Sequence, residues 1–177
     1  RALVNAVLRQ RAMTTKVVVP LASALVADRE QYFGLLDAYR AGDHQSIVSA
    51  FAAASRTAAE ESRRTADHLA AIPDEWRAAL GPVRSDSAAA RLLEILPTTP
   101  AFSTADACDA IDASESSVYA AIERLDEAGV IRPLTDRTRN QVWGAQLILD
   151  ELDDLSLRIE HTTRAATERS RSGSNVR

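Results

Sequence analysis

Residues 103–143 restrict the possible folds more than any other part of the sequence, because two short helical patterns are joined there by a tight turn. Ser103 precedes Asp106 by three residues, a capping-box spacing that predicts the start of the first helix. Asp112-Ala113-Ser114 then predicts a turn, in which the Ser114 hydroxyl caps the second helix. The order helix, turn, helix is typical of nucleic-acid-binding domains and of their relatives that bind proteins.

The second helix is predicted from Val118, Ile122 and Leu125, whose spacings of four and three give one buried face. Gly129 should end it, because glycine tolerates the positive φ of a helix C-terminus. Two short strands are expected at 130–135 and 141–143, and Pro133 restricts the first to a sheet edge. An apolar helix completes the core through Leu92, Leu93, Ile95 and Leu96. Together these elements predict a winged helix-turn-helix domain with a two-stranded wing.

Composition favours helices elsewhere, because the chain has only six Gly, six Pro and 5% aromatic residues and is rich in Ala. We therefore expect a mainly α fold. The single Cys108 excludes an internal disulfide and a cysteine-based zinc site. No apolar run approaches the roughly 20 residues that cross a bilayer, and no signal peptide opens the chain, so we expect a cytoplasmic protein without a membrane partner. Twenty of the 21 basic residues are Arg, which indicates a GC-rich bacterial genome.

Two long amphipathic patterns flank the winged helix. The first begins at Asp43 and is expected to stop at Pro73, with its charged residues 60–64 on the solvated side. The second carries Ile148, Leu152, Leu155 and Ile159 at spacings of four and three. It can pack on the first helix or against its twin in a dimer. We expect a protein partner or self-association through 44–72 and 148–159, and we expect the aromatic face at residues 32–39 to be core.

These patterns predict five segments along the chain. They are a helical part at 1–81, a linker at 82–86, the winged helix at 87–145, a packing or dimerisation helix at 146–169, and a disordered tail at 170–177.

The first half resembles the region that follows the catalytic loop in bacterial Fic proteins, which are AMP transferases. The residues that carry the resemblance are Arg1-Ala2-Leu3-Val4-Asn5-Ala6-Val7-Leu8-Arg9-Gln10-Arg11, Val17-Val18-Val19-Pro20-Leu21 and Asp28-Arg29-Glu30-Gln31-Tyr32-Phe33 with Leu35-Leu36. They lie within residues 1–72. Many bacterial members of the family carry a C-terminal winged helix, which matches residues 87–145.

The resemblance implies a catalytic loop that reads His-Pro-Phe-x-x-Gly-Asn-Gly-Arg-x-x-Arg and ends at Arg1. In this family the His acts as base toward a target hydroxyl, and the glycines and arginines hold nucleotide phosphates. Arg1 would face an ATP phosphate or an inhibitory Glu. ATP and Mg²⁺ are expected for the parent protein, and no cofactor is expected for this chain, since the loop residues before Arg1 are absent from it.

The residues of the chain itself predict neither a catalytic nor a metal site. His44, His68 and His161 are far apart and lack metal-ligand spacing. The six glycines are too dispersed to cradle a phosphate. The carboxylates at 60–61 and 150–154 fall on amphipathic helices, where solvation explains them.

DNA binding would use the second helix of the pair in the major groove and the wing beside it. The candidate contacts are Ser116, Ser117, Tyr119 and Arg124 on the helix and Arg137 and Arg139 on the wing. Residues 86–145 contain five Arg against ten Asp or Glu, a net charge of −5, which opposes phosphate binding. We therefore expect a regulatory, docking or dimerisation module. The alternative is a transcription regulator, in which the two flanking helices dimerise two winged helices onto a palindromic site.

Overall fold

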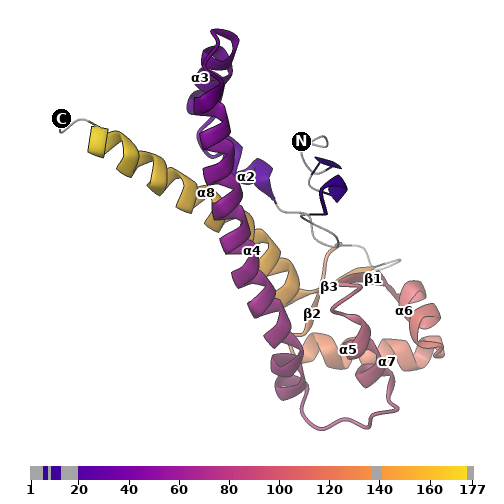
Figure 1. Ribbon diagram of the computed structural model, residues 1–177. Helices are drawn as coiled ribbons and strands as arrows, with labels where there is room; N and C mark the ends of the chain where they lie inside the picture. The colour runs from indigo at the N-terminus through magenta and orange to yellow at the C-terminus, as the bar shows by residue number, and fades with distance from the viewer. Residues whose placement is uncertain (1–5, 8, 13–19, 137–140, 175–177) are drawn as a thin grey trace. The chain divides into compact units, whose positions relative to one another are not determined.

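The computed structural model describes residues 6–7, 9–12, 20–136 and 141–174, apart from the side chains of 170–174 (Figure 1). The chain forms two compact units. The helical unit comprises residues 1–65 and 154–177, and the winged-helix unit comprises residues 66–153. Helices α4 (His44–Leu80) and α8 (Gln146–Ser174) run from one unit into the other.

Seven helices and three short strands make up the described part of the chain, which confirms the mainly α fold. The other elements are α2 (Leu21–Val26), α3 (Arg29–Arg40), α5 (Ala88–Ile95), β1 (Ala101–Ser103), α6 (Thr104–Ile111), α7 (Glu115–Glu127), β2 (Ile131–Pro133) and β3 (Val142–Ala145). None of the helices in the described residues has an apolar stretch long enough to cross a membrane.

The sheet of the winged-helix unit has a strand that the sequence did not predict. The strands are antiparallel in the order β1-β3-β2, so β3 is central. β2 and β3 form the expected wing. The added strand β1 places Phe102 opposite Trp143 and ends at the cap residue of α6. β1 has only three residues, which is too short for an alternating apolar pattern to predict a strand.

Local signals account for the ends of α6 and α7. The Ser103 hydroxyl accepts a hydrogen bond from the Asp106 backbone N–H, and Asp106 accepts one from the Ser103 backbone N–H, which confirms the capping box. Asp112 ends α6 at φ 46°, in the left-handed region. Ser114 caps α7, and Gly129 follows it at φ 68°, as its sequence position predicts.

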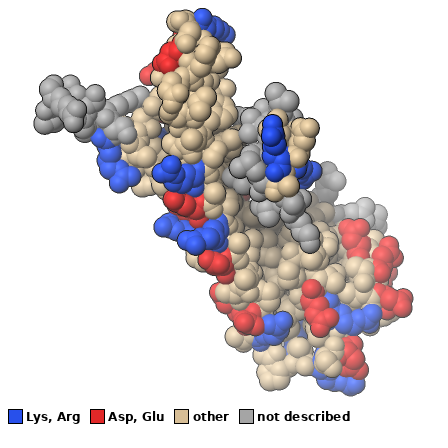
Figure 2. Space-filling view, viewed as in Figure 1, with Lys and Arg blue, Asp and Glu red and all other residues tan. Residues whose placement is uncertain are grey.

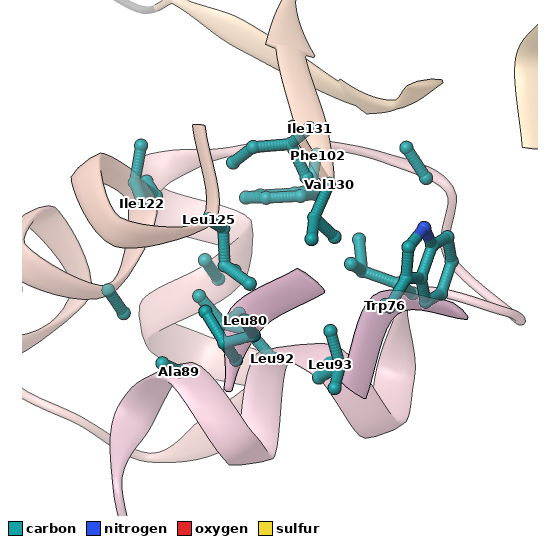
Figure 3. Packing of buried hydrophobic residues seen from close by; sticks show 14 of the residues in the cluster. Trp76, Leu80, Ala89, Leu92, Leu93, Phe102, Ile122, Leu125, Val130 and Ile131 are labelled. Carbon is teal, nitrogen blue, oxygen red and sulfur yellow. The ribbon is translucent and has the colours of Figure 1, made fainter. Parts of the chain in front are cut away.

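The core of the winged-helix unit includes the end of α4 (Figure 3). Pro73 was expected to stop this helix, and that expectation is wrong, because α4 continues to Leu80. Ile72, Trp76 and Leu80 follow one another at a spacing of four and are all buried. Burying Trp76 and Leu80, which follow Pro73, contributes about 1.5–3 kcal/mol each, which together offsets the roughly 3 kcal/mol cost of an interior proline.

The rest of this core comes from the three helices of the helix-turn-helix and from the sheet. Its largest fully buried members beyond Trp76 are Leu92, Leu96, Val118, Leu125, Val130 and Ile131. The apolar stripes predicted at residues 92–96 and 118–125 are therefore confirmed as core faces.

The helical unit has a small core in which α8 packs on α4. Ile159 of α8 is fully buried in a cluster with Ala54 and Ala58 of α4 and with Leu21 and Ala24 of α2. This is the first of the two packing alternatives left open by the sequence. α8 also extends to Ser174, beyond the expected end at residue 169.

Helix α3 corrects a second expectation. Its aromatic face was predicted to be core, yet α3 has no buried residue. Phe33 is 60% exposed and Tyr39 is 49% exposed. A 3.6-residue period predicts that one face of a helix is apolar. It does not predict which other element, if any, covers that face. Within the described residues, Phe33 and Tyr39 of α3 stay exposed, whereas Tyr32, Leu35 and Leu36 are half-buried.

Candidate interaction face of the winged helix

Helix α7 separates a buried face from a charged one. Val118, Ile122 and Leu125 are buried, as their spacing requires. Beside this buried face, Glu115, Tyr119 and Glu123 recur every four residues and are exposed. Tyr119 is 55% exposed, and neither a ring contact nor a hydrogen bond of its side chain occurs among the described residues. We call these three residues together with Ser116 the α7 face.

The serines at the start of α7 bond to one another. Ser114 Oγ lies 3.1 Å from Ser116 Oγ and 2.9 Å from Ser117 Oγ, and Ser114 also caps the Ser117 N–H. Ser116 and Ser117 remain exposed, so both predicted DNA contacts are on the surface. Their hydroxyls nevertheless already have partners within the turn.

The predicted cationic contact on α7, Arg124, is exposed but has a partner within the chain. Arg124 Nη2 donates a hydrogen bond to the Pro82 carbonyl oxygen at 3.1 Å, which ties α7 to the segment between α4 and α5. Arg137, Arg139 and Arg1 lie outside the described residues.

Most other arginines of this unit have acidic partners. Arg132 Nη2 on β2 lies 3.0 Å from Asp150 Oδ1 on α8. Two further pairs are local, Arg77 with Asp74 and Arg84 with Asp86. Such exposed pairs contribute only about 0–1 kcal/mol each, so a polyanion could release them. These ion pairs reduce the number of arginine charges in the unit that are available to a ligand.

Carboxylates dominate the charge of the winged-helix unit. Its sequence holds seven Arg against sixteen Asp and Glu, a net charge of −9, whereas the helical unit has a net charge of +5. Figure 2 shows acidic atoms gathered over the surface where Figure 1 labels α6. Asp106 in this helix accepts from the Ser103 hydroxyl and the Ser103 backbone N–H, and these bonds lower the pKa of its carboxyl group.

In the described part of the chain, the histidines do not form a catalytic or metal-binding cluster. His68 Nδ1 pairs with Glu151 at 3.0 Å within the winged-helix unit, and the His44 ring stacks at a tilt on Tyr39 with centroids 4.6 Å apart. Groups of three His, Cys, Asp or Glu residues able to hold a metal ion do not occur among the described residues. Cys108 is half-buried as a free thiol beside the core.

The helical unit contains a buried polar cluster that the sequence did not predict. Glu61 was assigned to the solvated side of its helix, and this assignment is wrong, since Glu61 is 4% exposed. Arg158 of α8 lies 3.4 Å from its Oε2 atom and also donates to Thr65 Oγ1 at 2.6 Å. In the sequence, Glu61 and Arg158 are 97 positions apart and are related only by their opposite charges. Many other pairs of residues share this relationship, so it does not predict a contact.

Comparison with known protein families finds no family model that matches the sequence, and comparison with curated proteins finds no match either.

Proposed function

We propose that this chain is the C-terminal part of a Fic-type AMP transferase whose winged helix is a docking or regulatory module that takes no part in the chemistry. The observation that carries the docking role is the α7 face, where an exposed Tyr119 lies between Glu115 and Glu123. Exposed aromatic residues are favoured anchors in protein interfaces, and flanking carboxylates select against polyanions.

The charge of this face argues against a duplex as the partner. A winged helix that reads DNA inserts its second helix in the major groove, which would bring Glu115 and Glu123 toward the phosphates. Release of Arg124 and Arg132 from their intramolecular partners would supply two positive groups, but the carboxylates would remain. The balance favours a neutral or basic protein surface.

The Fic-type origin rests on the resemblance of residues 1–72. The exposed aromatic side chains of α3 support it, because Phe33 and Tyr39 would be shielded in a larger helical catalytic domain. In that parent protein ATP and Mg²⁺ would bind upstream of this chain, with Arg1 facing a phosphate. We place the protein in the cytoplasm, where ATP is available.

The alternative is a DNA-binding transcription regulator. It is favoured by the surface position of Ser116, Ser117 and Tyr119 on the second helix, where a major-groove reader carries its base contacts. In this case α4 and α8 would hold two copies at the spacing of two half-sites.

The upstream coding sequence tests the origin first. It should encode His-Pro-Phe-x-x-Gly-Asn-Gly-Arg-x-x-Arg, with Arg1 as the final residue. A different upstream sequence would remove the Fic assignment while leaving the α7 face to be tested by itself.

The docking role is tested in the whole protein by AMP transfer from labelled ATP to its protein targets. Glu115→Lys/Tyr119→Ala/Glu123→Lys should change target modification several-fold while self-modification stays constant. Glu75→Lys, an exposed charge reversal on α4, is the matched control and should leave both activities unchanged. Equal target modification by all three proteins would exclude a docking role for the α7 face.

A further inference from the structure

We draw no further inference here: the strongest candidate, the half-open cavity of about 190 Å³ that α2, α3, α4 and α8 line with alanine, threonine and a few larger apolar side chains in the helical unit, borders half-buried apolar side chains of α3, and nothing in the structure shows what covers it.

Discussion

Glu61 of α4 and Arg158 of α8 form an ion pair inside the helical unit, with 3.4 Å between Glu61 Oε2 and Arg158 Nε. The Glu61 side chain is 5% exposed and that of Arg158 is 29% exposed. Thr65 accepts from Arg158, while Thr162 and Arg64 donate to Glu61 Oε1. Because the surrounding core is built from small residues such as Ala54 and Ala58, this polar layer can select one register of α8 on α4.

Arg158→Met should destabilise the protein by about 1–3 kcal/mol, since it leaves the buried Glu61 carboxylate with only the exposed Arg64 as a counter-charge. This range is below the 3–5 kcal/mol typical of a fully buried pair because Arg158 keeps some contact with water. Urea unfolding monitored by circular dichroism measures the change.

Two variants control this prediction. Glu61→Gln combined with Arg158→Met should recover part of the lost stability, because no charge is then left unpaired. Arg40→Ala removes an exposed pair with Asp37 in the same unit and should have little effect. An Arg158→Met protein as stable as the wild type would show that the pair does not hold α8 in place.

Gly144→Ala should destabilise the winged-helix unit by about 1 kcal/mol, because the added Cβ must displace the side-chain ends of two leucines that are only partly buried. An added Cβ would lie 2.6 Å from Leu149 Cδ1 and 2.8 Å from Leu134 Cδ1. Both leucines would have to move at once around the central strand of the sheet. Thermal unfolding followed by tryptophan fluorescence reports the change, since Trp76 and Trp143 belong to this unit.

Gly34→Ala provides the contrasting substitution. It lies within α3, and no atom is within 4 Å of the position of its added Cβ. Alanine should therefore stabilise the protein by about 0.5–1 kcal/mol through the higher helix propensity. If both glycine variants shifted the melting temperature in the same direction, the close packing around Gly144 would not be the cause of its effect.

Asp106 should make the stability of the winged-helix unit depend on pH in the acid range. Hydrogen bonds from the Ser103 hydroxyl and backbone N–H lower the pKa of this carboxyl group below its ordinary value of 3.8. A lowered native pKa means that the stabilisation is present above the unfolded pKa and is lost as the pH falls through the native one. Asp106→Asn should therefore lose less stability than the wild type between about pH 5 and pH 2. Parallel acid-unfolding curves for the two proteins would contradict this role.

The two helices of the winged helix could be predicted from the sequence because the residues that start and end them act locally. Ser103 with Asp106, Ser114 and Gly129 act within a few residues of their own position, so composition and spacing are enough to place α6 and α7. The buried face of α7 follows in the same way from the helical period.

The features that sequence reasoning missed depend on contacts made far along the chain. Pro73 does not stop α4, because Trp76 and Leu80 gain burial against a core built from residues 89–148. Strand β1 exists because β3, forty residues later, pairs with it. Glu61 is buried because α8 brings Arg158 to it. On the candidate face, the spacing of Tyr119 and Glu123 was visible in the sequence, whereas the turn of Arg124 toward Pro82 was not.

A fluorescence-anisotropy titration of this chain with labelled duplex DNA, at low and at physiological salt, distinguishes an α7 face that docks a protein from one that reads DNA. The wild type should show no binding at physiological salt and at most weak binding without sequence preference at low salt. Glu115→Gln/Glu123→Gln should strengthen the low-salt binding, because it removes two of the opposing charges. Binding that persists at physiological salt with sequence preference, and that Tyr119→Ala abolishes, would identify α7 as a DNA-reading helix and contradict the docking role.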